Sequence, residues 1–96
     1  MTDDLRALMV AYQSGEPEAF DALHARLAPV LRRHLAALAK DGSWVDELLE
    51  ETFLQIHRAR RTYSPAFPVQ PWAFAIARHV FLTSGRRPGP GRSDSR

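Results

Sequence analysis

Hydrophobic positions recur at helical spacing in the first 40 residues. In residues 3–13 the apolar side chains share one stripe, with Thr2 suited to cap the helix and Gly15 to end it. A second stripe runs through residues 17–40, where a proline in the first turn is tolerated. Pro29 is expected to interrupt or kink this second helix, because its ring forfeits an internal hydrogen bond. The pattern predicts two helices here.

Two further helices are predicted downstream. The clearest amphipathic pattern of the chain spans residues 45–56, and Ser43-Trp44-Val45-Asp46 has the form of a capping box before it. This third helix should run to about residues 61–63 and give way to a loop with two prolines. Pro71 then suits the first turn of a fourth helix, which Gly85 ends.

The remaining pattern settles the expected architecture. No stretch alternates as a strand does, so the fold class is predicted to be all-α, a compact bundle of about four helices. Residues 1–85 should form this one helical domain. Residues 86–96, rich in Arg, Pro, Gly and Ser, are too poor in apolar groups to fold alone and are predicted to be a flexible, disordered tail or linker.

Charge is divided unevenly along the chain. The 96 residues carry a net charge of +2, but residues 1–56 hold five basic and ten acidic side chains. Residues 57–96 hold eight arginines against Asp94 alone. An acidic front and a basic back favour two different partners, a basic protein surface and a polyanion.

The sequence lacks the motifs of an enzyme or a metalloprotein. There is no cysteine and no glycine-rich phosphate loop, and the histidines at 24, 34, 57 and 79 never stand four residues apart on one helix. We therefore expect a non-enzymatic protein with no cofactor and no bound metal. No apolar run approaches the roughly 20 residues of a membrane helix, so no membrane insertion and a cytoplasmic location are expected.

Two surfaces stand out as candidate binding sites. The third helix gathers four acids, Asp46, Glu47, Glu50 and Glu51, beside its apolar stripe. Such a face suits charge-assisted docking on the arginines of another protein, although a solvated helix face is the plainer reading. Beyond it, arginines alternate with aromatic residues, a composition that suits single-stranded nucleic acid because aromatic faces stack on unpaired bases.

These residues resemble a known family. Asp46-Glu47-Leu48-Leu49-Glu50-Glu51-Thr52-Phe53-Leu54, then Arg58-Ala59-Arg60, the prolines at 65 and 68, and Trp72 with Ile76-Ala77-Arg78 are similar to region 2 of bacterial sigma factors of the extracytoplasmic-function group. Ala28-Pro29-Val30-Leu31 is similar to the family's preceding helix. The likeness extends from about Leu5 to Arg87.

The resemblance implies a role in transcription initiation. In that family the third helix docks on the clamp helices of the RNA polymerase β′ subunit, and the loop with the fourth helix captures the unwound minus-ten promoter strand. Carried across, Glu47, Glu50 and Glu51 match polymerase contacts, with Asp46 in support. The resemblance also implies an anti-sigma factor as a further partner. Together with the basic, aromatic composition, this assigns promoter DNA binding to Arg58, Arg60, Arg61, Tyr63, Phe67, Arg78, His79, Arg86 and Arg87.

The sequence departs from the family at several positions. His79 replaces the family's asparagine at the base-facing position, Thr83 replaces an aspartate, and Glu50 replaces a glutamine. Two alternatives stay open beside promoter binding. One is a diverged sigma-like interaction domain, a polymerase-binding regulator or anti-sigma target, without strand capture. The other is an unrelated helix-turn-helix protein whose fourth helix would read duplex DNA.

Overall fold

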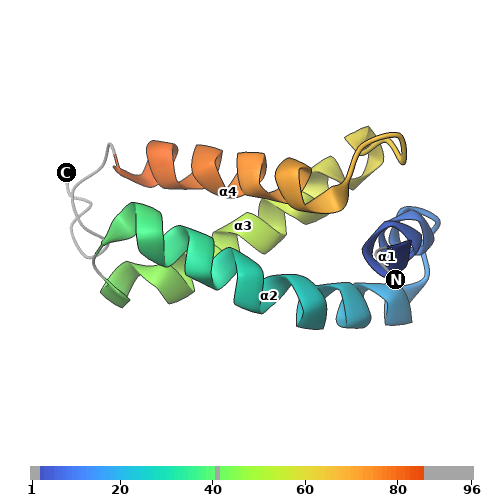
Figure 1. Ribbon diagram of the computed structural model, residues 1–96, viewed down its shortest axis with the longest axis horizontal. Coiled ribbons are helices and arrows are strands. Elements are labelled where there is room, and N and C mark those ends of the chain that lie inside the picture. Colours follow the sequence, from blue (N-terminus) through green and yellow to red (C-terminus); the bar gives the residue numbers. More distant parts are fainter. Residues whose placement is uncertain (1–2, 41, 86–96) are drawn as a thin grey trace.

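The computed structural model of the chain describes residues 3–40 and 42–85. Within these residues it has helices and no strand, which confirms the all-α prediction (Figure 1). The helices are α1 (Asp3–Gln13), α2 (Pro17–Ala39), α3 (Val45–Ala59) and α4 (Val69–Gly85), with short 3-10 turns η1 (Gly42–Trp44) and η2 (Arg60–Thr62).

The three longer helices form the body of the domain. Figure 1 shows α2, α3 and α4 lying side by side along the long axis, while α1 runs across the beginning of α2 and is seen nearly end-on. The turn between α1 and α2 is tight because Gly15 adopts a φ of 97°, a conformation that other residues rarely take. The end of α1 is thereby brought beside η2, far away in the sequence.

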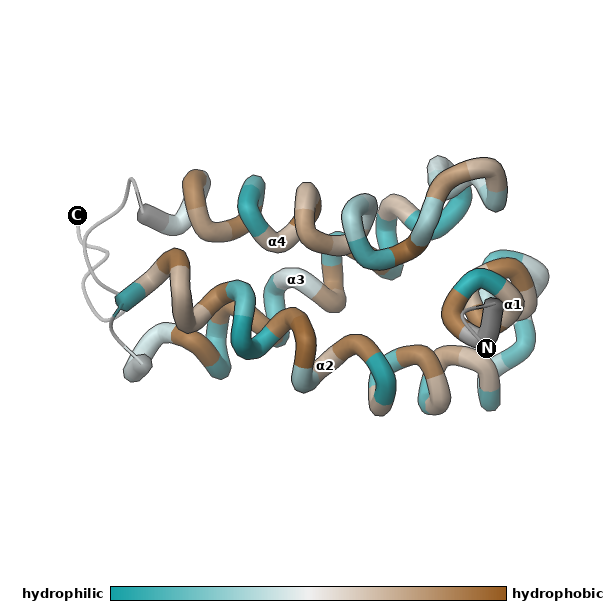
Figure 2. The backbone as a smooth tube through the Cα atoms, in the orientation of Figure 1, coloured by the Kyte–Doolittle hydropathy of each residue, from teal (hydrophilic) through white to brown (hydrophobic). Residues whose placement is uncertain are grey.

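The core lies where the apolar stripes of these helices meet. Hydrophobic and hydrophilic positions alternate around α2, whereas α4 is hydrophobic over most of its length (Figure 2). The buried hydrophobic residues of the bundle come from every helix: Met9, Tyr12, Ala19, Leu23, Leu27, Leu31, Leu35, Val45, Leu48, Leu49, Phe53, Ile56, Val69, Ala73, Ala77 and Val80. Thr52 is buried among them, and its hydroxyl donates to the carbonyl of Leu48 at 2.7 Å.

The expected interruption at Pro29 does not occur. The helix α2 continues through this residue to Ala39. Pro29 and Ala25, whose carbonyl loses its helical partner, are both exposed, so water can bond to that carbonyl. The buried leucines on either side of Pro29 hold both halves of the helix against the same core. The helix ends only where Lys40 turns to a φ of 63° and donates its N–H to Ala36.

The residue that directly precedes α3 is not the predicted cap Ser43. The turn η1 precedes α3, and the residue at the N-cap is Trp44, which makes no side-chain capping bond. The carboxylate of Asp46 instead reaches across to Arg32 of α2. The start of α3 is therefore fixed by packing and by this contact between helices.

The remaining helix ends agree with the sequence to within a few residues. The helix α3 stops at Ala59 and tightens into η2, and α4 starts two residues before Pro71, which lies in its first turn as predicted. Trp72 and Phe81 of α4 are half-buried and pack against the core. The predicted cap Thr2 and the tail of residues 86–96, with Arg86 and Arg87, lie outside the described residues.

Candidate functional site

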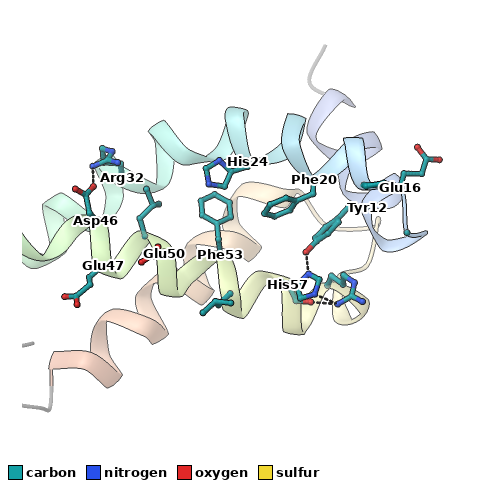
Figure 3. Close-up of a pocket in the computed structure, with 15 residues that line it drawn as sticks. Tyr12, Glu16, Phe20, His24, Arg32, Asp46, Glu47, Glu50, Phe53 and His57 are labelled. Atoms are coloured by element: carbon teal, nitrogen blue, oxygen red, sulfur yellow. Dashed lines mark hydrogen bonds and ion pairs between the residues drawn. The ribbon is translucent and has the colours of Figure 1, made fainter. Parts of the chain in front are cut away.

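A groove of about 900 Å³ runs between α2 and α3 and reaches the turn after α1 (Figure 3). Its walls are largely apolar: Phe20 of α2 meets Phe53 of α3 edge-on, with ring centroids 6.3 Å apart. The centroid of the His24 ring lies 4.1 Å from the centroid of the Phe53 ring. Leu54, which is 49% exposed, extends this apolar lining to the surface of α3. A groove of this kind suits the apolar face of a partner helix.

Three of the four acids predicted to bind polymerase line this groove. Asp46, Glu47 and Glu50 lie along its wall on the first two turns of α3, as Figure 3 shows. Asp46 accepts a hydrogen bond from Arg32 at 2.5 Å, and both side chains are well exposed. No hydrogen bond or ion pair with another part of residues 3–40 and 42–85 engages Glu47 or Glu50. The groove therefore has an apolar interior and an acidic end with two free carboxylates.

The fourth acid takes a different position. Glu51 is half-buried, does not line the groove, and accepts a hydrogen bond from the side-chain amide of Gln55 at 3.0 Å. The sequence placed all four acids on one polar face. The helix instead separates Glu51 from the other three.

The opposite end of the groove is closed by a cluster of Tyr12, His57 and Arg60. The hydroxyl of Tyr12 is hydrogen-bonded to Nδ1 of His57, and the guanidinium of Arg60 lies 5.9 Å from the centre of the Tyr12 ring. Burial raises the pKa of Tyr12 above its usual value, and the nearby charge of Arg60 partly opposes this shift. Arg60 also donates to the carbonyl of His57 at 2.6 Å.

Most of these lining residues were not predicted from the sequence as part of a site. Tyr12 belongs to α1, and Phe20, His24 and Arg32 belong to α2; no motif links them to α3. Arg60 was predicted to bind DNA, but its half-buried side chain contacts this groove. One feature of the sequence could have indicated that these residues lie together. Tyr12 and Phe20 are aromatic residues on the apolar stripes of the two helices that the first turn joins.

The loop after η2 presents one large aromatic side chain to solvent. Phe67 is 64% exposed, while Tyr63 at the start of the loop is only 3% exposed. The Tyr63 ring packs against Trp72 with centroids 5.2 Å apart, and its hydroxyl donates to the carbonyl of Phe67 at 2.5 Å. In this conformation Tyr63 is therefore almost completely buried, and Phe67 is the aromatic residue of the loop that faces solvent.

The other residues predicted to bind DNA are spread over this end of the molecule. Arg58 and Arg61 are exposed at the end of α3 and in η2, and Arg78 and His79 are exposed on α4. Arg78 lies nine residues beyond the start of α4, about 14 Å along the helix axis. These side chains flank Phe67 at a distance and do not form a closed pocket with it.

The described residues form neither a metal-binding cluster nor a membrane-spanning helix. No group of three or more His, Asp or Glu side chains within the described part of the chain is placed to hold a metal ion. Among the helices of residues 3–40 and 42–85, none combines the length and the apolar character that crossing a membrane requires.

Comparison with known proteins identifies the family. The model of the Sigma-70 region 2 family matches residues 23–89, which is most of the chain. The chain therefore belongs to the Sigma-70 region 2 family, which confirms the resemblance noted in the sequence. The match begins within α2, so α1 precedes it.

Two relatives carry sigma-factor names. The chain is 36% identical to the RNA polymerase sigma factor CarQ of Myxococcus xanthus over 72% of this chain and 40% of the relative. It is 32% identical to the ECF RNA polymerase sigma factor SigF of Caulobacter vibrioides over 91% of this chain and 51% of the relative. The chain thus spans about half the length of these relatives. No solved structure matches it significantly.

Proposed function

We propose that this domain takes part in transcription initiation by docking on core RNA polymerase through the groove between α2 and α3. The observation that carries the proposal is the combination of an apolar interior with the free carboxylates of Glu47 and Glu50 at one end. An amphipathic helix with basic residues on its flank would bury its apolar side against Phe53 and Leu54 and pair its charges with the acids. The clamp helices of the β′ subunit are the partner that family membership suggests.

We further propose that the loop around Phe67 and the exposed face of α4 capture the unwound minus-ten strand. An exposed phenylalanine ring contributes little to the stability of the fold, but it can stack on an unpaired base. Arg58, Arg61 and Arg78 are exposed and would bind the phosphates of the strand irrespective of sequence. This activity belongs in the cytoplasm, where polymerase and promoter are both present.

The first proposal is tested by site-specific photo-crosslinking in the presence of core RNA polymerase. A photoreactive residue in place of Leu54, 49% exposed in the groove, should crosslink to the β′ subunit. The matched control is the same substitution at Leu82, 48% exposed on α4 and outside the groove. Crosslinking of equal strength from both positions, or from Leu82 alone, would contradict docking through the groove.

A second candidate function has one observation in its favour. Tyr63 is buried and Arg60 is engaged in the groove, so two residues expected to bind the promoter strand are used elsewhere. A sigma-like interaction domain that binds polymerase or an anti-sigma factor without capturing DNA would need only the groove. Binding of a minus-ten oligonucleotide by the complex with polymerase distinguishes the two.

Duplex reading by α4, the helix-turn-helix alternative, is disfavoured by the exposed side of that helix. Besides Arg78, His79 and Thr83, it presents Pro71, Ala75 and Leu82. The Thr83 hydroxyl donates to the carbonyl of His79 within the helix at 2.7 Å, which leaves Arg78 and His79 to face base edges where recognition helices use three or four side chains.

A further inference from the structure

The end of α1 is tied to the end of α3 by one side chain. The amide nitrogen of Gln13 donates to two backbone carbonyls, that of Arg60 at 2.8 Å and that of Tyr63 at 2.7 Å. Arg60 is the first residue of η2, and Tyr63 is the residue directly after η2. Because one amide group has two N–H donors, Gln13 can satisfy both acceptors at once. It thereby fixes the direction in which the chain leaves η2.

The next link joins this tie to the loop. Tyr63, whose carbonyl Gln13 holds, donates its hydroxyl to the carbonyl of Phe67 and packs its ring against Trp72 of α4. The loop between them is closed by a hydrogen bond from the N–H of Phe67 to the carbonyl of Ser64 at 3.0 Å. The loop backbone that carries the exposed Phe67 ring is therefore held by hydrogen bonds both at Tyr63 and at Phe67.

None of the sequence motifs that predict strand binding includes Gln13, the residue at which this series of contacts starts. Gln13 lies in α1, ahead of residues 23–89 matched by the family. It is half-buried, and it contacts the loop's base without reaching the surface that carries Phe67. Its neighbour Tyr12 lines the groove, so α1 contacts both the groove and the base of the loop that carries Phe67.

We propose that Gln13 is a positioning residue for strand capture, acting through Tyr63 to hold Phe67 where a base can stack on it. This inference rests on the proposed strand-capture function. It assigns α1 a task beyond packing. Without Gln13 the Tyr63 carbonyl would be left to water, the Arg60 carbonyl would keep only its 3.4 Å hydrogen bond from the Tyr63 N–H, and the base of the loop could rotate.

Three variants test the proposal in the complex of the full chain with core RNA polymerase. Gln13→Met keeps the length of the side chain but removes both donors, and Tyr63→Phe removes only the hydroxyl while retaining the ring against Trp72. Phe67→Ala removes the stacking ring. Ser14→Ala is the matched control, because the Ser14 hydroxyl donates back to the carbonyl of Val10 in α1.

Binding of a single-stranded minus-ten oligonucleotide and retention of polymerase are measured for each variant. We expect Gln13→Met and Tyr63→Phe each to weaken oligonucleotide binding roughly three- to tenfold, with polymerase retention and the Ser14→Ala control unchanged. Adding Gln13→Met to Phe67→Ala should cause no further loss, because the two residues act through one ring.

Three results would overturn the inference. If Phe67→Ala weakens binding but Gln13→Met and Tyr63→Phe are both silent, strand capture stands and the positioning role is wrong. If Gln13→Met weakens binding to the same extent with and without Phe67, or lowers polymerase retention as well, the residue only stabilises the fold. If Phe67→Ala is itself silent, strand capture fails and the inference fails with it.

Discussion

Arg32 of α2 and Asp46 of α3 join the two walls of the groove through a hydrogen bond of 2.5 Å between guanidinium and carboxylate. The side chains are 53% and 82% exposed, so water competes for both charges. The pair sits at the end of the groove where Glu47 and Glu50 are free. Of the three acids that line the groove, Asp46 is therefore paired within the domain, whereas Glu47 and Glu50 remain available to a partner.

The exposed position of this pair predicts that it adds little to stability. Arg32→Ala should lower the free energy of unfolding by only about 0.2–1 kcal/mol, because solvent screens the attraction. Polymerase retention should not fall, since the change releases Asp46 and makes the groove end more acidic. Urea denaturation and a pull-down of core polymerase measure the two quantities. A loss of stability above about 2 kcal/mol would show that the pair is structural.

The cluster at the other end of the groove predicts a dependence on alkaline pH. Because burial raises the pKa of Tyr12, the folded state holds this proton more tightly than the unfolded state. Its contribution to stability is present below the unfolded pKa of about 10 and is lost as the pH rises through the higher folded value. The melting temperature should therefore fall above about pH 10 more steeply in the wild type than in Tyr12→Phe. Parallel curves would contradict this assignment.

Two leucines separate folding from docking. Leu31 is fully buried in α2, so Leu31→Ala should cost about 2–5 kcal/mol of stability by leaving a cavity. Leu54 is half-exposed in the groove, and Leu54→Ala should change stability by under about 1 kcal/mol while weakening polymerase retention. Thermal unfolding and pull-down of each variant provide the comparison. Undiminished retention by Leu54→Ala would remove the apolar part of the docking site.

The strand-capture proposal predicts a specific salt dependence. If Arg78 neutralises one phosphate of single-stranded DNA, Arg78→Ala should make the slope of log affinity against log salt shallower by about 0.7. His79→Asn, which introduces the residue common in the family, should change the preferred base more than the overall affinity. Titrations at several salt concentrations with oligonucleotides differing at one base measure both effects. An unchanged slope would place Arg78 away from the DNA.

The helices could be predicted from the sequence because local pattern determines them. The spacing of apolar residues placed α1 and α4 almost to the residue, and Gly15 marked the turn that the structure has. The prediction failed where tertiary packing outweighs local preference. Pro29 should break an isolated helix, but leucines packed on either side keep α2 continuous.

Only part of the candidate site could be predicted from the sequence. The acids of α3 are adjacent in the chain and could be recognised together, but the groove exists because Tyr12, Phe20 and His24 are brought to α3 from other helices. The burial of Tyr63 could not be predicted either, since an aromatic residue before a proline-containing loop is equally consistent with a core or a surface position.

The measurement that tests the central claim most directly is retention of core RNA polymerase by Glu47→Lys/Glu50→Lys. Both carboxylates are exposed in the groove and free of partners in the described part of the chain, so reversal should leave the melting temperature nearly unchanged. The matched control is Glu18→Lys/Asp21→Lys, which reverses two exposed acids of α2 outside the groove. The account predicts that the groove variant loses polymerase and the control retains it. Retention at the wild-type level by the groove variant, or equal loss in both, would contradict docking through this groove.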